Sequence, residues 1–170
     1  MMCGITGTPG TGKSSVADAL ARRGYPMVRL IDTIQPYAIG RDEGRDTLVI
    51  DEERWVQEFT PVDGFVEGHF AHLLPCDRVV VLRCRPDRLL ERLRGRGYKE
   101  EKCRENTEAE ALDVCLIEAL ERHDPSHLLE IDGTGMGSDE VADIIEEFFL
   151  GRIPPSHGSI DWSEYLLEQA

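Results

Sequence analysis

Residues 7–14 read Gly7-Thr8-Pro9-Gly10-Thr11-Gly12-Lys13-Ser14 and fit the pattern G-x-x-x-x-G-K-S. Glycines in such a loop let backbone N–H groups turn inward and approach a phosphate closely. The lysine of the pattern reaches the β- and γ-phosphates of a nucleotide, and the serine hydroxyl ligates Mg²⁺. This stretch therefore predicts a P-loop that binds a nucleoside triphosphate.

The residues on either side of the loop support this interpretation. A short apolar run over residues 1–6 precedes it, and residues 15–23 have a helical pattern that Gly24 closes. Strand, loop and helix are the setting in which a P-loop works, because the helix N-terminus adds its positive dipole end. A Gly-rich turn that matches by chance would lack this context.

Length and composition predict one globular domain. The chain has 170 residues, of which 41% are hydrophobic and 31% charged, which is enough for a real core. No apolar run approaches the ~20 residues of a membrane span, and a P-loop this near the first residue leaves no room for a signal peptide. The five cysteines are odd in number and form no C-x-x-C pair, so we expect buried thiols and a reduced, cytoplasmic location.

The chain is strongly acidic, with 33 acidic against 19 basic residues and a net charge of −14. Such a field disfavours non-specific binding to RNA or DNA. It suits a basic protein partner. The alternative is that the charge only keeps the protein soluble in a salty cytoplasm.

Apolar runs that alternate with helical patterns predict an α/β fold: a central parallel five-stranded sheet flanked by helices. We expect strands at 1–6, 27–31, 64–69 (with a polar end), 77–84 and 128–131, with 77–84 the best candidate for a central strand. We expect helices at 15–23 and 51–59, one that starts at Pro86, a single long one at 99–123, and one at 139–149 with Ser138 as N-cap. Residues 41–46 resemble an exposed loop, and 151–170 form a tail with a short helix at 160–167.

Ligands of a parallel sheet bind at the carboxyl ends of its strands. The P-loop, Asp32, Glu67 and Asp132 are expected to gather there. Ser14 and Glu67 are the candidate Mg²⁺ residues, because carboxylate and hydroxyl oxygens hold this ion and its water shell. His69 is a candidate for orienting an attacking water or the acceptor phosphate; the alternative is an ordinary histidine at a loop edge.

Arginines are concentrated in residues 83–96, which contain six of them: Arg83, Arg85, Arg88, Arg92, Arg94 and Arg96. Phosphoryl transfer needs cations around the transferred group, and arginine supplies a planar, always-charged fork. We predict that at least two of the six contact nucleotide, the alternative being a solvated helix face. Residues 95–97, Gly-Arg-Gly, are a plausible hinge into a mobile lid. The chain lacks the N/T-K-x-D motif of GTPases, and its size favours a small nucleoside monophosphate (NMP) kinase over larger ATPases.

Three elements together resemble a known family. Residues 7–15 (GTPGTGKSS), the strand-end carboxylate-x-His of Glu67 and His69, and residues 91–98 (E-R-L-x-x-R-G-Y) are similar to the atypical adenylate kinase family. These are small nuclear or archaeal NTPases that also act in small ribosomal subunit biogenesis. The similarity covers about residues 4–150, and residues 48–53 also resemble the family's segment after its NMP-binding region.

The resemblance implies a P-loop kinase domain over 1–150, with an NMP-binding region at about 30–50 and a lid at about 95–105. It implies adenylate kinase activity, ATP + AMP to 2 ADP with Mg²⁺, and ATPase activity beside it. The residues assigned to ATP are Gly10, Thr11, Gly12, Lys13, Ser14, Ser15 and Arg96. Those assigned to catalysis are Lys13, Glu67, His69, Arg92 and Arg96, and Asp32 and Asp51 are assigned to the NMP. For Asp32, a role in positioning the acceptor and a purely structural role as a cap both stay open.

The resemblance also implies a basic ribosomal protein of the small-subunit platform as partner, with indirect contact to rRNA. The sequence departs from the family in two places. Glu67 stands where eukaryotic members usually have aspartate, and the tail from Pro154 has no match. A ribosome-assembly ATPase, a nucleotide-gated chaperone and a kinase of another small molecule, such as shikimate or gluconate, remain alternatives.

Overall fold

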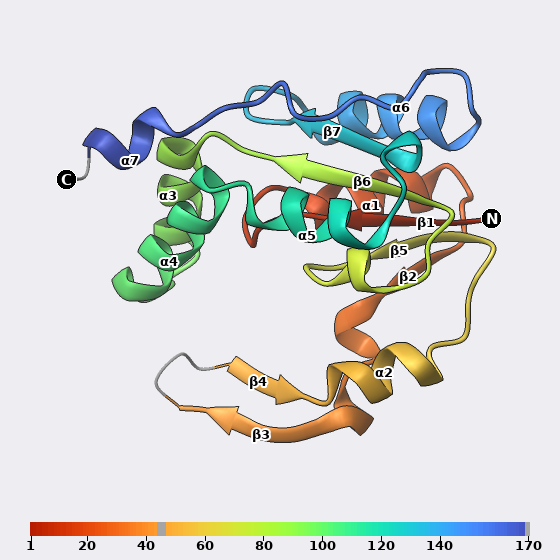
Figure 1. Ribbon diagram of the computed structural model, residues 1–170, viewed down its shortest axis with the longest axis horizontal. Coiled ribbons are helices and arrows are strands. Elements are labelled where there is room, and N and C mark those ends of the chain that lie inside the picture. Colours follow the sequence, from red (N-terminus) through yellow and green to blue (C-terminus); the bar gives the residue numbers. More distant parts are fainter. Residues whose placement is uncertain (44–46, 169–170) are drawn as a thin grey trace.

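A five-stranded parallel sheet forms the centre of the computed structural model, which describes residues 1–43 and 47–168 (Figure 1). The strand order is β2-β5-β1-β6-β7. The strands are β1 (Met2–Thr6), β2 (Met27–Arg29), β5 (Gly64–Glu67), β6 (Arg78–Arg83) and β7 (Leu128–Asp132). All four neighbouring pairs are parallel, which confirms the predicted fold.

The sequence indicated residues 77–84, which contain β6, as the best candidate for a central strand. In the structure the strand at the centre of the sheet is β1. β1 lies between β5 and β6, and every one of its residues is buried. β6 lies one place further out, between β1 and β7. Its run Val79-Val80-Val81 is fully buried because helices cover both faces of the sheet, so its apolar sequence does not distinguish it from β1.

Helices pack on both faces of the sheet. The helices of the described residues are α1 (Lys13–Arg22), α2 (Glu52–Glu58), α3 (Pro86–Gly95), α4 (Glu100–Ala111), α5 (Val114–Arg122), α6 (Ser138–Phe149) and α7 (Glu164–Glu168). Of these, α3 and α4 pack mainly against each other, and α7 packs against α4. α1 and α6 share one core, which includes Leu20, Ile145 and Phe148. α2 and α5 share the core of the other face, which includes Trp55 and Leu116. The five cysteines are buried and free, as predicted.

The single helix predicted over 99–123 is wrong. The chain forms α4 and α5, separated at Leu112 and Asp113, and Asp113 has a left-handed φ of 57°. Aspartate adopts this conformation more readily than most residues. Arg83 holds the break, because its guanidinium donates to the carbonyl of Glu110 at 2.9 Å and to the Asp113 carboxylate.

The N-cap predicted for α6 is displaced by one residue. Gly137 occupies the cap position, and Ser138 is the first helical residue. The Glu140 carboxylate reaches back and accepts a hydrogen bond from the Gly137 N–H at 2.7 Å. This bond satisfies an amide at the start of the helix that would otherwise lack a partner.

The segment between β2 and β5 contains a hairpin that the sequence did not indicate. The predicted strand 27–31 ends at Arg29, and two 3₁₀ turns follow, η1 (Leu30–Asp32) and η2 (Gln35–Tyr37). Strands β3 (Ala38–Asp42) and β4 (Thr47–Ile50) then pair antiparallel and project away from the main sheet (Figure 1). Of the predicted loop at 41–46, residues 41 and 42 are therefore strand, and residues 44–46 lie outside the described residues.

The tail lies against the domain. Ser156 pairs with Leu129 as an added parallel bridge at the edge of β7, and the Glu130 N–H donates to the Ser156 carbonyl at 2.7 Å. α7 then packs against α4, and Trp162 and Tyr165 are half-buried. Across the described residues, no helix combines the length and the apolar character needed to cross a membrane.

Candidate nucleotide site

The P-loop has the backbone that its glycines allow. Gly7 and Gly10 have φ values of +144° and +93°. A Cβ atom on Gly7 would lie 2.3 Å from the Leu82 carbonyl oxygen, so this position accepts only glycine. The loop wraps around the start of α1, whose first residue is Lys13. Backbone N–H groups and the positive end of the helix dipole therefore face the same space.

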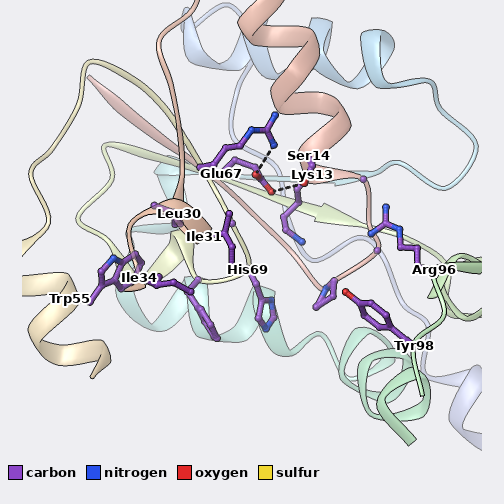
Figure 2. A pocket seen from close by; sticks show the side chains of 16 residues that line it. Lys13, Ser14, Leu30, Ile31, Ile34, Trp55, Glu67, His69, Arg96 and Tyr98 are labelled. Carbon is purple, nitrogen blue, oxygen red and sulfur yellow. Dashed lines mark hydrogen bonds and ion pairs between the residues drawn. The ribbon is translucent and has the colours of Figure 1, made fainter. Parts of the chain in front are cut away.

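A cavity of about 370 Å³ opens beside the loop (Figure 2). One side is polar and contains Lys13, Ser14, Glu67, His69 and Arg96. The opposite wall is apolar and is formed by residues from η1, the link between η1 and η2, α2 and the segment after β5: Leu30, Ile31, Ile34, Trp55 and Phe70. The cavity therefore suits a ligand with a charged group, which would bind at the polar side, and a flat apolar group, which would pack on the apolar wall.

Lys13 lies inside the loop. Its Nζ donates to the carbonyl oxygens of Gly7 at 2.8 Å and Thr8 at 2.9 Å. Burial lowers the pKa of Lys13 to about 8, and the nearby charge of Arg96 adds to this, while Glu67 opposes it. The ammonium group is thus held where the loop's backbone amides converge.

Ser14 and Glu67 bring two oxygens together at the mouth of the loop. Ser14 Oγ donates to Glu67 Oε1 at 3.3 Å, and Glu67 lies at the end of β5, beside β1. Mg²⁺ in kinases is held by one or two protein oxygens plus substrate phosphates and water. Within the described residues there is no cluster of three or more His, Cys, Asp or Glu that could hold a metal alone. The Ser14–Glu67 pair therefore fits an ion that arrives with a nucleotide.

Arg29 is a neighbour of this pair that the sequence reasoning missed. Its Nη1 donates to Glu67 Oε2 at 3.4 Å, and its other terminal nitrogen pairs with Asp18 of α1. Arg29 thus holds Oε2 of Glu67, while Oε1 of the same carboxylate faces Ser14. Arg29 ends the observed strand β2, whereas the predicted strand ran on to residue 31, so the sequence did not place Arg29 at a strand end.

His69 lies at the side of the cavity with a defined tautomer. Its Nδ1 donates to the Gly7 carbonyl at 3.0 Å, so Nδ1 carries the hydrogen and Nε2 is an acceptor. Burial lowers the pKa of His69, which favours this neutral form. A neutral imidazole whose Nε2 is an acceptor is able to orient a water molecule.

Two of the six clustered arginines reach the P-loop. Arg92 donates to the carbonyl oxygens of Gly10 at 3.4 Å and Thr134 at 3.2 Å, and it lines a second cavity of about 370 Å³. Arg96 lines both cavities. The other four are engaged in ion pairs with acidic neighbours: Arg83 with Glu110, Asp113 and Glu130, Arg85 with Asp87, Arg88 with Glu91, and Arg94 with Glu100.

Of the predicted strand-end carboxylates, only Glu67 lines either cavity. Asp32 is exposed in η1, and Asp132 accepts a hydrogen bond from the Thr134 N–H at 3.0 Å. Asp51 is the N-cap of α2 and accepts from the Arg54 N–H at 3.1 Å. The assignment of Asp32 and Asp51 to NMP binding stays a prediction.

Aromatic residues complete the first cavity. Trp55 is almost fully buried, and its Nε1 donates to Thr33 Oγ1 at 3.0 Å, which fixes the indole against η1. Tyr98, two residues after Arg96 in the chain, lines the same cavity. The sequence reasoning used Tyr98 only as part of a motif and did not identify Trp55, because its partners come from a distant segment.

The parallel sheet, the P-loop and the cations around one cavity define a P-loop phosphotransferase of the NMP-kinase type. The chain matches the family model described as an AAA domain over residues 3–113. It is 45% identical to a protein of Archaeoglobus fulgidus named "Putative adenylate kinase", over 95% of this chain and 92% of the relative. A protein of the same name from Methanothermobacter thermautotrophicus is 44% identical, over 98% and 99%. The chain therefore belongs to the same family as these archaeal proteins, each named "Putative adenylate kinase".

Solved structures show the same fold at low identity. Shikimate kinase from Acinetobacter baumannii in complex with shikimate superposes with a TM-score of 0.62 at 18% identity, covering 88% of this chain and 93% of that one. The YorR protein of Bacillus subtilis in complex with phosphorylated GDP gives a TM-score of 0.58 at 18% identity, over 93% and 100%. At this identity the likeness bears on the fold alone.

Proposed function

We propose that this protein transfers the γ-phosphoryl group of ATP to AMP and yields two ADP. The observation that carries the proposal is that the two cavities share Gly10, Gly12 and Arg96. Two nucleotides, one in each cavity, would meet with their phosphates over the P-loop. The name of the archaeal relatives supports AMP as the acceptor.

The donor nucleotide is assigned to the second cavity. Its phosphates lie on Gly10, Thr11, Gly12, Lys13, Ser14 and Ser15. Lys13, Arg92 and Arg96 stabilise the negative charge on the transferred group, and this stabilisation is most of the catalysis in phosphoryl transfer. Ser14 and Glu67 would hold Mg²⁺, whose charge adds to theirs when it is bound with ATP. The transfer is in line and requires no protein nucleophile.

The acceptor is assigned to the first cavity. Its apolar wall at Ile31, Ile34 and Trp55 suits a flat base, and its phosphate would face Lys13 and Arg96. Asp32, in the proposed NMP-binding region at about 30–50, and Asp51, which follows that region, remain proposed acceptor residues.

The test follows ADP formed from Mg-ATP with AMP, GMP, CMP or UMP. We expect ADP formation that depends on AMP. Replacing Arg96 with alanine should lower kcat/KM by at least about 100-fold, since a transition-state cation is lost. Arg94→Ala is the matched control, because Arg94 is two residues away and pairs with Glu100 outside both cavities. Similar losses in both variants, or equal rates with and without AMP, would contradict the proposal.

We also propose an ATPase activity, which the tautomer of His69 favours. A neutral Nε2 acceptor beside the loop is placed to orient an attacking water when no acceptor is bound. His69→Ala should therefore reduce ATP hydrolysis more than transfer to AMP. The exposed His127 provides the control substitution. Equal losses in hydrolysis and transfer would remove the reason for this role.

A role in small ribosomal subunit maturation, in the cytoplasm, is proposed from the sequence resemblance. The net charge of −14 supports a basic platform ribosomal protein as partner, with indirect contact to rRNA. ADP production measured with and without that protein, at low and high salt, tests this. Stimulation without AMP would favour an assembly ATPase. Tight binding without turnover would favour a nucleotide-gated chaperone.

A further inference from the structure

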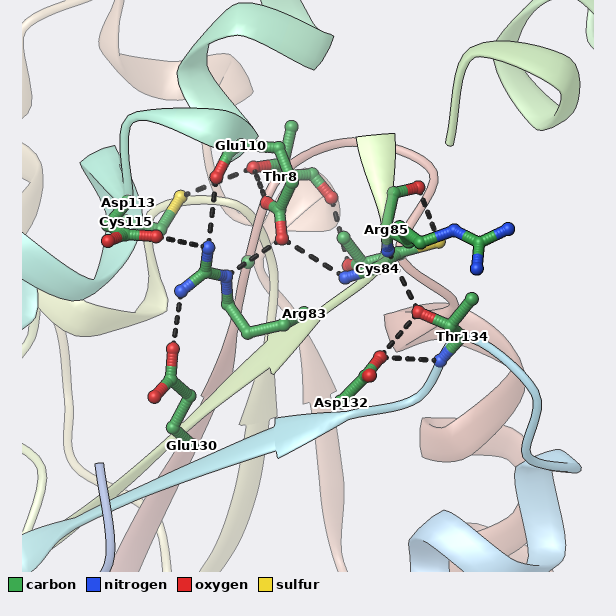
Figure 3. Close-up of polar contacts among 12 residues, drawn as sticks. Thr8, Arg83, Cys84, Arg85, Glu110, Asp113, Cys115, Glu130, Asp132 and Thr134 are labelled. Carbon is green, nitrogen blue, oxygen red and sulfur yellow. Dashed lines mark hydrogen bonds and ion pairs between the residues drawn. The ribbon is translucent and has the colours of Figure 1, made fainter. Parts of the chain in front are cut away.

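A buried carboxylate lies behind the P-loop, outside both nucleotide cavities (Figure 3). Glu110 is the penultimate residue of α4 and is 1% exposed. Its Oε2 accepts from Thr8 Oγ1, and its Oε1 accepts from Arg83 Nε at 2.8 Å and from the Cys84 N–H at 3.0 Å. One side chain thus joins the P-loop, the end of β6 and α4.

Protein groups satisfy the remainder of this network. Arg83 also donates to the Glu110 carbonyl and to the carboxylates of Asp113 and Glu130. Glu130 accepts a further bond from the Gly158 N–H at 2.7 Å. Buried ion pairs gain little stability over apolar packing of the same volume. Their geometry is strict, however, so the network fixes the relative positions of the elements that it joins.

Thr8 connects this network to Lys13. Its hydroxyl is bonded to Glu110, while its carbonyl oxygen accepts from Lys13 Nζ at 2.9 Å and from Thr11 Oγ1 at 2.9 Å. The Thr8 side chain is buried, so water does not replace the Glu110 contact. A shift of Thr8 would move the carbonyl that holds Lys13.

We propose that Glu110 is a positioning residue for phosphoryl transfer: it holds the P-loop through Thr8 and so fixes the place of Lys13. Because the proposed lid at about 95–105 includes the first residues of α4, and Glu110 lies near the other end of that helix, the same contact ties the P-loop to the helix that continues from the lid. The proposal rests on the proposed nucleotide binding at the P-loop, but it does not depend on which acceptor is used.

The principal test is Thr8→Val, which removes the hydroxyl, keeps the shape of the side chain and leaves the Arg83–Glu110 pair in place. The matched control is Thr107→Val. Thr107 is as buried as Thr8 and lies in α4, the helix that contains Glu110. Its hydroxyl donates to the Cys103 and Arg104 carbonyls and not to the P-loop. Thr8→Ser restores the hydroxyl. The measurements are Kd for Mg-ATP by calorimetry, kcat and KM, and Tm.

We expect Thr8→Val to lower kcat by about tenfold to about 100-fold, as small misplacements of catalytic groups do, and to weaken ATP binding. Thr8→Ser should recover most of both. Thr107→Val should keep the wild-type Kd and kcat, even where its Tm falls as far. Equal effects of Thr8→Val and Thr107→Val on kcat, or an unchanged kcat in Thr8→Val, would overturn the proposal.

Glu110→Gln gives a second measurement, because glutamine keeps the shape but loses the charge. Its effect on kcat should not add to that of Thr8→Val in the double variant, since both act through one contact. Full additivity would contradict the proposal. If Glu110→Gln does not fold, the Thr8 series still decides. A wild-type protein that binds ATP without phosphorylating AMP would instead contradict only the proposed acceptor.

Discussion

At the scale of single residues, burial gives Lys13 an acid–base behaviour that an exposed lysine lacks. Its pKa of about 8 lies below the usual 10.5. As the pH rises from 8 to 10.5, Lys13 is therefore neutral in an increasing share of the nucleotide-free protein, whereas an exposed lysine would still be mostly charged. Phosphate oxygens favour the charged form. We therefore predict that ATP binding near pH 8.5 takes up most of one proton, and that ATP affinity falls as the pH increases above 8.

Calorimetry in two buffers with different ionisation enthalpies measures this proton uptake. Lys13→Arg is the control, because arginine stays charged throughout the range and should abolish the uptake. Wild-type binding at pH 8.5 without proton uptake would show that Lys13 is already charged in the free protein.

The P-loop residues could be assigned from the sequence because a local backbone pattern encodes their task. The arginines could not be sorted in the same way. Arg88 pairs with Glu91 within one helix turn, which is visible in the sequence. The partners of Arg83 are 27 to 47 residues away, so its structural role depends on the fold.

At the scale of elements, α2 depends on its N-cap. The Asp51 carboxylate accepts from the Arg54 N–H at 3.1 Å. Asp51→Ala should lower the free energy of unfolding by about 1 kcal/mol, whereas Asp51→Ser should retain most of it. Chemical denaturation measures both. Equal stability of the two variants would contradict the capping role. Because Asp51→Ser keeps a cap but loses the charge, an increase in its KM for AMP would indicate that the Asp51 carboxylate contacts the acceptor.

His72 joins β1 to α5 and should make the protein sensitive to acid. This fully buried residue contacts Thr6 Oγ1 at 2.7 Å through Nδ1 and Glu118 at 3.0 Å through Nε2. Burial lowers its pKa to about 4 from 6.5, so the unfolded chain binds a proton first. The stability is present above pH 6.5 and is lost as the pH falls toward 4, by about 3 kcal/mol at pH 4.

Denaturation curves at pH 7, 5.5 and 4 test this expectation. His72→Gln should remove this part of the pH dependence, although it lowers the stability at pH 7. An unchanged slope between pH 6.5 and 4 in the variant would assign the acid sensitivity to other groups.

The predictability of each element followed its burial. The five sheet strands are apolar runs because the sheet is covered on both faces. The residues of β3 are mostly exposed, so its sequence lacks the alternation of apolar and polar residues that would predict a strand of the hairpin. The break between α4 and α5 contains neither glycine nor proline, and it depends on the long-range contact of Arg83 with Asp113.

At the scale of the whole molecule, a net charge of −14 produces self-repulsion in the folded state. Salt screens interactions between exposed charges over about 10 Å at 0.1 M and about 3 Å at 1 M. We predict that Tm rises by at least a few degrees between 0.05 and 1 M KCl, where each kcal/mol corresponds to about 2–4 °C. A Tm that falls with KCl would show that surface ion pairs outweigh the repulsion.

The pairing of Ser156 with β7 has a consequence for the order of events during synthesis. The chain emerges from the ribosome N-terminus first, so β7 is made before the segment that covers its outer edge. Until residues 156–158 have emerged, the N–H of Glu130 and its carboxylate lack the partners that the tail provides. An uncovered strand edge is a template for pairing with another chain. The nascent domain is therefore most exposed to mispairing in the interval before its tail is released.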